Sequence, residues 1–580
     1  MTRFNTRKMT ILMQDPSVRI GGRLVFAQVD LPYEDLAPGP VGYRVRVADF
    51  DASANVLYMP FQPVPDRDGV PQDKYAYTGA DNDAKAYKAW ENQLLADPAF
   101  HAQNVYAIVM RTLGLFEFAL GRRVAWGFEG HQLHVAPHAF LEANAFYSEE
   151  DKALMFGYFD SAKTKKRVFT CLSHDIIAHE TTHALLDGVR DGFTYLSTPD
   201  QAAFHEGFAD VVALLSVFSL PKAVELALTG GKLPRQQNHI RLIPAAQVTA
   251  KAILNSMLLG LGKEFGASLD EEGARADCLR RSAQIEPDSN LLHSADYEQP
   301  HVRGELFAAA ILRSFVALWS SRIEALGMFG RSDYNLDLVI DAGASAAANL
   351  LTMAIRALDY CPPIDLTFNA YLSALLTADN EVAPDDTKYN YRKRLKDSFA
   401  SFGILPPDKG TDAGSGCWLP FTNDADITYQ RNHAPSMLYD KEEVFRFVWE
   451  NRRALGLDDR GYLRIRSVRP SVRTGPDGFS LRETVCEYLQ VFDIFGAESK
   501  ATLGIERPEG MPSSQPITAY GGGIIVFDQL GRIKYHIEHR LDDAARQTAR
   551  LEYLWSTGQM NARQDVRNQF SHLHRSRAMA

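Results

Sequence analysis

The spacing of hydrophobic positions changes along the chain and divides it into regions of different structure. Up to about residue 80, short runs such as GRLVFAQVDL and GYRVRVADF are typical of strands and are separated by loops rich in Pro, Gly and Asp. From Phe100 a helical periodicity follows and ends at Gly121, and HQLHVAP and NAFY again indicate strands. We therefore expect a β-rich region over 1–80 and an α/β lobe over 81–170.

Helical spacing dominates residues 171–405, where long segments such as PDQAAFHEGFADVVALLSVF and ELFAAAILRSFVALWSSRIEAL predict an α-helical lobe. Pro, Gly, Ser and Asp then concentrate over 406–420, as in a linker. Beyond it, a helix near 440–454, several strand-like runs and a helix from Asp542 predict a smaller α+β domain over 421–566. The polar tail 567–580 is expected to fray. The predicted fold class is α+β.

Composition and charge exclude several classes of protein. Of 580 residues, 46% are hydrophobic and 23% charged, which suits a globular protein with more than one core. The net charge is −10 without a long basic stripe, so we expect no nucleic-acid partner. The first residues do not resemble a signal peptide, and no run reaches ~18 uninterrupted apolar residues. We therefore expect no membrane partner and, by default, a cytoplasmic location; export by another route and the oligomeric state are left open.

The cysteines favour a reducing compartment. They are odd in number, far apart and contain no CxxC pair, which argues against a zinc site built from cysteine. Their positions are Cys171, Cys278, Cys361, Cys417 and Cys486.

A motif of the form HExxH lies within the helical lobe, as His179-Glu180-Thr181-Thr182-His183. Residues four apart share a helix face with Cβ atoms about 5–6 Å apart, so the two imidazoles can converge on one cation. Glu180 is offset beside them, where its carboxylate can reach a metal-bound water. Chance gives roughly 0.03 such motifs in a chain of this composition, so the motif alone is only suggestive.

Neighbouring residues support a helix at this motif. Ser173 can cap its start, Asp175 suits the positive end of the helix dipole, and Gly188 can close it. The histidines at 131, 134 and 138 match no compact ligand spacing, and the apolar residues near them indicate strand and loop instead of a second metal site.

The next predicted helix offers a third ligand. It begins with the capping box TPDQ at 198–201, and Glu206 follows two turns later. Asp210 lies four residues beyond, on the same face, where it could accept the second ring N–H of a ligating histidine. His205 points roughly 100° away from Glu206, which indicates either a residue that supports a ligand or an exposed side chain.

At this point the sequence resembles the thermolysin-like branch of the gluzincin metallopeptidases, whose pattern is HExxH followed by ExxxD. The resemblance covers roughly residues 85–400. It implies that His179, His183 and Glu206 hold one Zn²⁺ per chain, that Asp210 supports a ligand, and that Glu180 activates the attacking water. It also implies a thermolysin-like fold, with a β-rich N-terminal part and an α-helical C-terminal part, here followed by the extra α+β domain.

Further matches extend the resemblance. Asn144 and Ala145 open a segment, NAFY, that resembles the family's edge strand, which binds substrate as an added strand. Asp296 stands five residues before His301, as in the family, where the histidine stabilises the oxyanion and the aspartate orients it. Two weaker matches give Tyr195 as another oxyanion donor and Arg280 as a group that binds a substrate carbonyl. The acidic cluster typical of structural calcium is not evident, so calcium is not predicted.

The sequence thus predicts a zinc metallopeptidase that acts on a peptide or protein substrate. An endopeptidase is preferred, because no motif that would bind a free α-amine is recognisable. Two alternatives stay open. One is an aminopeptidase with the same zinc site, and the other is a catalytically latent, zinc-containing binding or scaffold protein in which the C-terminal domain carries the function.

Overall fold

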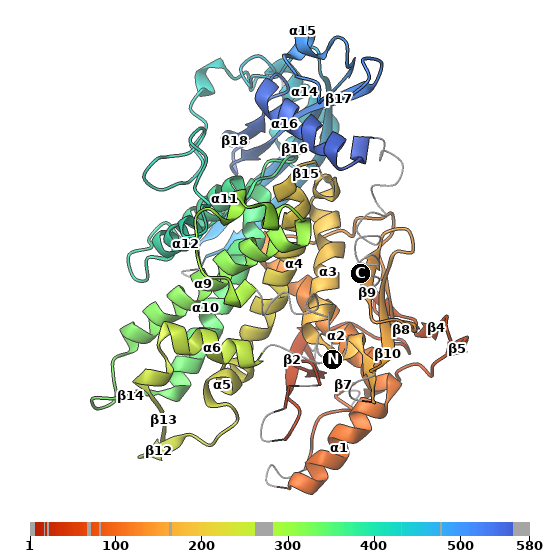
Figure 1. The fold of residues 1–580 in the computed structure, drawn as a ribbon, viewed down its shortest axis with the longest axis vertical. Helices are drawn as coiled ribbons and strands as arrows, with labels where there is room; N and C mark the ends of the chain where they lie inside the picture. The colour runs from red at the N-terminus through yellow and green to blue at the C-terminus, as the bar shows by residue number, and fades with distance from the viewer. Residues whose placement is uncertain are drawn as a thin grey trace.

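The computed structural model describes residues 6–16, 18–19, 22–65, 71–79, 83–161, 165–195, 197–260, 282–430, 432–475 and 478–560. These residues form a mixed α and β structure, in agreement with the general α+β class expected. The N-terminal strands lie beside a central group of helices, and the C-terminal sheet lies across one end of that group (Figure 1). Arg280 and the tail 567–580 lie outside the described residues.

The N-terminal part is built on a five-stranded sheet. Its strands are β3 (Val45–Val47), β8 (Leu133–Phe140), β9 (Ala145–Ser148), β10 (Ala153–Asp160) and β11 (Arg167–Phe169). The order along the sheet is β11-β10-β8-β3, and β9 also pairs with β10. Strand β8 runs parallel to β3 and β10, whereas β9 and β11 are antiparallel to β10.

Short hairpins and two helices complete this part. The hairpins are β1 (Thr6–Leu12) with β2 (Phe26–Pro32), β4 (Phe50–Asp51) with β5 (Val56–Leu57), and β6 (Val64–Pro65) with β7 (Pro71–Gln72). Helix α1 (Ala84–Ala96) is followed by the mostly buried α2 (Pro98–Leu120). As expected, α2 ends at Gly121, whose φ of 66° is the left-handed conformation that glycine adopts without steric cost.

Helices make up the central part. They are α3 (His174–Val189), α4 (Pro199–Phe218), α5 (Pro221–Thr229), α6 (Ala250–Gly260), α9 (Pro300–Leu326), α10 (Leu336–Ala357), α11 (Phe368–Val382) and α12 (Tyr391–Ala400). Short 3-10 turns and the small sheet β12 (Arg235–Gln237), β13 (Ile240–Pro244) and β14 (Asp333–Asn335) connect them. The helices predicted around the HExxH motif and over 199–218 are confirmed.

The ends of α3 differ in detail from the prediction. The helix continues through Gly188 to Val189, so the expectation that this glycine closes it is wrong. Gly188 instead allows the backbone at Ala125 to pass close to α3, because a Cβ on residue 188 would lie 1.9 Å from the carbonyl oxygen of Ala125. Ser173 is the N-cap residue, but its hydroxyl donates to Asp175 and does not accept a helix N–H.

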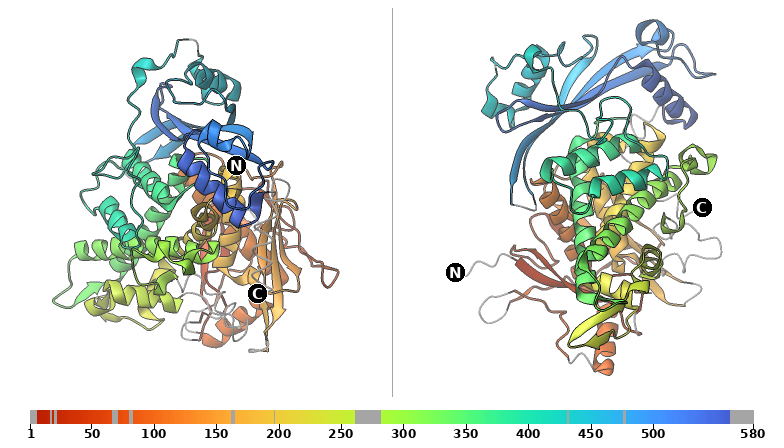
Figure 2. Two further views of the ribbon diagram at one scale, coloured as in Figure 1. Left: turned by 45° about the horizontal axis from the view of Figure 1, so that its top comes forward. Right: turned by 90° about the vertical axis from the view of Figure 1, so that its left-hand side faces the viewer.

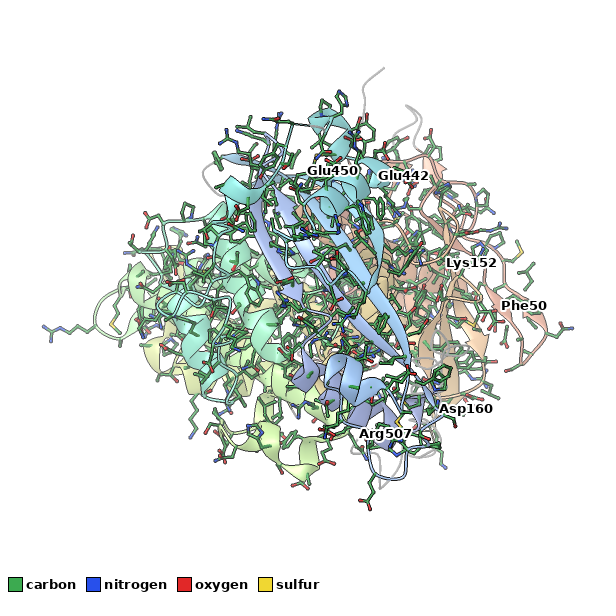
Figure 3. All side chains as sticks on the ribbon, turned by 90° about the horizontal axis from the view of Figure 1, so that it is seen from above. Phe50, Lys152, Asp160, Glu442, Glu450 and Arg507 are labelled. Atoms are coloured by element: carbon green, nitrogen blue, oxygen red, sulfur yellow. The ribbon has the colours of Figure 1, made fainter. Side chains whose placement is uncertain are left out.

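The C-terminal part is a four-stranded antiparallel sheet with helices. The strands are β15 (Tyr462–Thr474), β16 (Ser480–Phe495), β17 (Pro516–Phe527) and β18 (Ile533–His539), and the helices are α13 (Ala434–Met437), α14 (Lys441–Glu450), α15 (Ser499–Leu503) and α16 (Ala544–Ser556). Viewed from above, Glu442 and Glu450 on α14 lie toward one end of the sheet and Arg507 toward the other (Figure 3).

This sheet is packed on both faces. Alternate residues of a strand point to opposite faces, and on β17 Ile524 and Val526 join the core of the central helices. Ile525 and Phe527 point the other way and pack with Phe447 of α14 in a separate cluster. The long strands also descend along the helices (Figure 2, right), where the Val472 N–H donates to the Gly121 carbonyl at 2.9 Å. The C-terminal sheet therefore shares a core with the central helices.

The segment 406–420 is irregular but attached to the central helices. Trp418 is buried, its backbone N–H donates to the Thr377 hydroxyl at 2.8 Å, and its indole N–H donates to the Tyr360 carbonyl at 3.0 Å. The connection between the central and C-terminal parts is therefore attached to the central helices through Trp418.

A buried ion network joins all three parts at Asp359. This carboxylate accepts from Arg122, just after α2, at 2.6 and 2.7 Å, and from Arg473 on β15. Burial by itself raises the pKa of Asp359, but the charges of Arg122, Arg473 and Arg190 outweigh it and hold the pKa well below its usual range. The stabilisation is therefore present above the ordinary carboxyl pKa and is lost as the pH falls toward the lowered value.

In the part of the chain that the structure describes, two helical stretches, Pro300–Leu326 and Leu336–Tyr360, are long and apolar enough by composition to cross a membrane, and α4 with α5 would form a third, bent by 83°. Of the most apolar windows of the first two, 72% and 67% are buried inside the protein. Their apolar residues therefore largely face the interior of the helical part.

Replacing Asp359 with Asn should lower the free energy of unfolding by about 3–5 kcal/mol, because the guanidinium of Arg122 loses its counter-charge and that of Arg473 keeps Glu483 alone. Urea denaturation followed by near-ultraviolet circular dichroism measures the change. The control Asp542→Asn breaks the exposed pair with Arg540 and should cost about 1 kcal/mol or less. A loss that small for Asp359→Asn would contradict the central role of this network.

Candidate active site

Helices α3 and α4 bring together the three residues predicted to bind zinc. The Nε2 atoms of His179 and His183 lie 3.0 Å apart. The two carboxylate oxygens of Glu206 lie 3.6 Å from His179 Nε2 and 3.8 Å from His183 Nε2. All three side chains are largely buried.

These distances fit a single tetrahedral cation. With metal–ligand bonds of roughly 2.0–2.2 Å, tetrahedral ligand atoms lie roughly 3.3 Å from one another. The observed separations of 3.0, 3.6 and 3.8 Å bracket this value. Two imidazoles and one carboxylate are also the donor set of a catalytic zinc site with an open position.

The outer nitrogen of each histidine has a close partner, and that of His179 is held in the tautomer that a metal requires. His179 Nδ1 lies 2.8 Å from Asp210 Oδ1, as predicted, so it donates its proton there and leaves the Nε2 lone pair toward the cluster. His183 Nδ1 lies 2.7 Å from Nδ1 of His205, whose ring stacks on it at 12°. His205 is buried, so the alternative of an exposed side chain is wrong, and its role in supporting a ligand stays a prediction.

The carboxylates around His179 stabilise a positive charge at the cluster formed by His179, His183 and Glu206. Burial lowers the pKa of His179, but the hydrogen bonds to Asp210 and Glu206 and the charge of Glu180 raise it well above its ordinary value. A cation in the cluster would satisfy the same carboxylates that otherwise favour protonation of the ring.

Glu180 faces both the cluster and the N-terminal sheet. One of its carboxylate oxygens and a ring nitrogen each of His179 and His183 all lie within 4.8 Å of one another. Glu180 Oε2 also accepts the backbone N–H of Tyr147 on β9 at 3.1 Å. The general base predicted from the sequence thus lies between the histidines and a β-strand.

Strand β9 presents one edge to this site. Among the described strands it pairs with β10 alone. The Gly157 N–H of β10 donates to the Asn144 carbonyl at 2.8 Å, so Asn144 and, by alternation, Phe146 turn their peptide groups toward β10. Ala145 and Tyr147 therefore turn theirs outward, and the Tyr147 contact with Glu180 agrees. Asn144 Oδ1 accepts the Ala145 N–H at 2.9 Å, which fixes the start of the edge.

Two glycines let α4 and α9 approach closely enough to add His301 to the site. A Cβ on Gly207 would lie 2.6 Å from the Gly304 carbonyl oxygen, and one on Gly304 would lie 2.9 Å from that of Ala203. His301 precedes Gly304 by one turn, and Glu206 adjoins Gly207. As a result, His301 Nδ1 lies 3.3 Å from Glu206 Oε2.

Three other predicted residues are less closely tied to the cluster. Asp296 is exposed in the short 3-10 turn Ala295–Tyr297, and its orienting role stays a prediction. Tyr195 is 45% exposed, its backbone carbonyl accepts the side-chain amide of Gln201, and its role as an oxyanion donor stays a prediction. Arg280 lies outside the described residues, so its role also stays a prediction.

Sequence reasoning missed the backbone N–H of Tyr147 and left the role of His205 open. The first could have been found from strand alternation, since residue 147 points the same way as Ala145. The second carried no local signal, because the contact depends on how α3 packs against α4.

Comparison of the chain with models of known protein families gives no match, and a search of curated proteins finds no significant relative. The functional argument therefore rests on the geometry of these residues and on the motifs that they form.

Replacing His205 with Phe should weaken zinc binding by about 10–100-fold, because the buried Nδ1–H of His183 loses its acceptor while the ring stacking is kept. Competition with a chromophoric chelator measures the affinity. His205→Gln is the matched control, since its amide oxygen can accept the same proton and should restore most of the affinity. Equal affinity in the Phe variant and the parent protein would contradict a supporting role.

Proposed function

We propose that this protein is a zinc-dependent metallopeptidase of the thermolysin-like kind, with His179, His183 and Glu206 as the zinc ligands. The observation that supports this best is the position of Glu180, whose carboxylate lies within 4.8 Å of the ligand atoms of both histidines and accepts a backbone N–H from the outward edge of β9. A purely structural zinc site has no need of a carboxylate between the metal and a strand edge.

The chain's own residues divide the chemistry among them. When bound, Zn²⁺ would supply Lewis acidity toward a water molecule and a substrate carbonyl. Glu180 accepts a proton from the attacking water and passes it to the leaving amine, so that a C–O bond forms and the C–N bond breaks. Its present hydrogen bond to Tyr147 holds the carboxylate at the strand edge where the scissile peptide would lie.

The oxyanion requires donors on the far side of the carbonyl. His301, held beside Glu206 by the contact of α4 with α9, donates a ring N–H to the developing negative charge. Asp296 orients this ring, and Tyr195 adds its hydroxyl as a second donor. These three roles follow the resemblance, and the position of His301 beside the third ligand supports the first of them.

The substrate binds in an extended conformation along β9. Ala145 and Tyr147 turn their peptide groups outward at a two-residue interval, as pairing with an added strand requires. A bound substrate strand would replace Asn144 Oδ1 and Glu180 Oε2 as the partners of their N–H groups. Asn144 supports this edge, and Arg280 is proposed to bind a substrate carbonyl. A strand edge of this kind forms hydrogen bonds with the substrate backbone on both sides of the cleaved bond, which favours an endopeptidase over an aminopeptidase.

We further propose a cytoplasmic enzyme that has no membrane or nucleic-acid partner. Among the described residues the cysteines at 171, 361, 417 and 486 are free and buried, which suits a reducing compartment. Burial of most of each membrane-length window inside the helical part also supports a soluble protein.

Glu180→Gln should retain zinc but lose at least about 100-fold in kcat, because the amide cannot accept the water proton. Elemental analysis and turnover of a cleaved peptide, first identified in a peptide library, measure the two properties. Glu150→Gln, an exposed change of the same kind, should leave both unchanged. Full turnover in Glu180→Gln would refute the proposed base, and a zinc-loaded parent protein inert toward the library would favour the latent binding protein.

Peptides with an acetylated N-terminus should be cleaved at internal bonds at rates similar to those of unblocked peptides, because binding depends on the backbone along β9. Mass spectrometry of the products after a timed digest identifies the bonds. Cleavage confined to unblocked peptides, one residue from the N-terminus, would show an aminopeptidase instead.

A further inference from the structure

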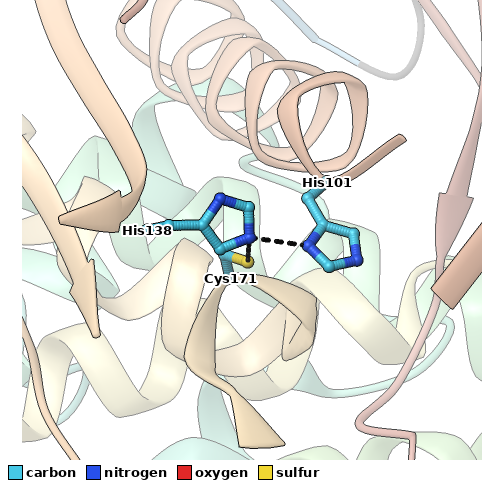
Figure 4. Close-up of side chains that lie close together, drawn as sticks. All are labelled: His101, His138 and Cys171. Atoms are coloured by element: carbon cyan, nitrogen blue, oxygen red, sulfur yellow. Dashed lines mark hydrogen bonds between the residues drawn. The ribbon is translucent and has the colours of Figure 1, made fainter. Parts of the chain in front are cut away.

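A second group of metal-ligand side chains lies in the core, outside the proposed active site. It consists of His101 on α2, His138 on β8 and Cys171 in the 3-10 turn Thr170–Leu172 that leads into α3 (Figure 4). Their ligand atoms all lie within 4.8 Å of one another, and the three residues are 2%, 1% and 0% exposed. The expectation that the histidines near 131–138 form no metal site rested on their mutual spacing, whereas here one of them meets two distant residues.

The outer nitrogen of each histidine is already committed as a donor. His101 Nε2 lies 3.0 Å from the Leu95 carbonyl, which can only accept, so this nitrogen carries a proton. His138 Nδ1 lies 2.8 Å from Asp49 Oδ2, and the other oxygen of Asp49 accepts the His138 backbone N–H at 3.1 Å. A backbone carbonyl and a carboxylate are the usual partners of metal-binding histidines.

This arrangement leaves two lone pairs facing each other. His101 Nδ1 and His138 Nε2 are 2.8 Å apart, and two neutral rings in these tautomers would repel there. A positive charge between them is required, either one extra proton or a metal cation.

Cys171 supplies the third donor. Its Sγ lies 4.0 Å from His138 Nε2. Around a tetrahedral zinc, nitrogen atoms would lie roughly 3.3 Å apart and nitrogen and sulfur roughly 3.6 Å apart, given bonds of roughly 2.0–2.1 and 2.3 Å. The observed 2.8 and 4.0 Å need shifts of a few tenths of an ångström. The histidine pair of the proposed active site is contracted to a similar degree, at 3.0 Å.

We propose that His101, His138 and Cys171 bind a thiophilic metal ion of the Zn²⁺ or Cu⁺ class, separate from the active site. Two imidazoles and a thiolate suit these ions, whereas Mg²⁺ and Ca²⁺ require oxygen ligands. Binding releases the thiol proton of Cys171 and the proton shared by the two rings to solvent. For Zn²⁺, one thiolate and the Asp49 carboxylate balance the two positive charges, so the buried site is neutral.

The site would anchor the zinc-binding helix to the N-terminal part. Cys171 lies three residues before His174, the first residue of α3, while His101 and His138 belong to a buried helix and to the main sheet. Phe169 packs on both histidine rings, with centroid distances of 5.0 and 5.2 Å, and the three ligand side chains are buried. A structural role follows from this burial.

The test uses the full chain with His179→Ala and His183→Ala, which removes the proposed active-site metal. This protein is reconstituted under reducing conditions with Zn²⁺ or with Cu⁺, freed of unbound metal and analysed for metal content. About one ion per chain should remain, and the element retained identifies the class. Adding Cys171→Ser should remove it, whereas Cys361→Ser, a buried thiol bonded to the Ala357 carbonyl, should not.

X-ray absorption of the reconstituted double variant provides a readout that needs no further substitution, in case Cys171→Ser does not fold. One sulfur atom at roughly 2.3 Å from the metal is expected. Absence of bound metal after reconstitution would overturn the proposal and leave a shared proton between the rings. A bound ion without a sulfur neighbour would also overturn it. Because the active-site ligands are already removed, neither result bears on the proposed peptidase activity.

Discussion

The central helix α4 is buried on every side, and this constraint organises the molecule around it. A buried polar side chain without a partner is costly, so each polar residue of α4 has to meet another element. Asp200 accepts from Arg303 of α9, Gln201 donates to the Gly192 carbonyl, His205 meets His183, and Asp210 meets His179. The helix thereby fixes the positions of its neighbours, because its buried polar side chains need hydrogen-bond partners from them.

The same constraint explains why the chemistry is concentrated here. Glu206 stands in the row of buried polar residues on α4, and its partners are the ring nitrogens of three histidines from two other helices. A carboxylate so enclosed stabilises positive charge strongly, whether a proton or a metal ion. Small residues at the crossing of α4 with α9 are what allow the third of these rings to reach it.

Local signals in the sequence predicted much of this arrangement. Thr198 and the proline after it mark the start of α4. The helical spacing of HExxH places two rings on one face of α3. Glu206 lies two turns into α4, at the position that faces these rings. What failed depended on contacts between distant residues. Gly188 continues a helix where glycine often ends one, because the chain near Ala125 passes close to it. His205 meets His183 only when α3 packs against α4, which no local pattern records.

The shared core between the central helices and the C-terminal sheet has a consequence for how the protein is made. Residues of β16, β17 and β18 pack on apolar side chains of helices that precede them by more than 80 residues and are synthesised earlier. In a nascent chain, this apolar surface of the helices therefore stays exposed until the strands have been synthesised. The core of the helical part is therefore complete only after β18 has been synthesised and has packed against it.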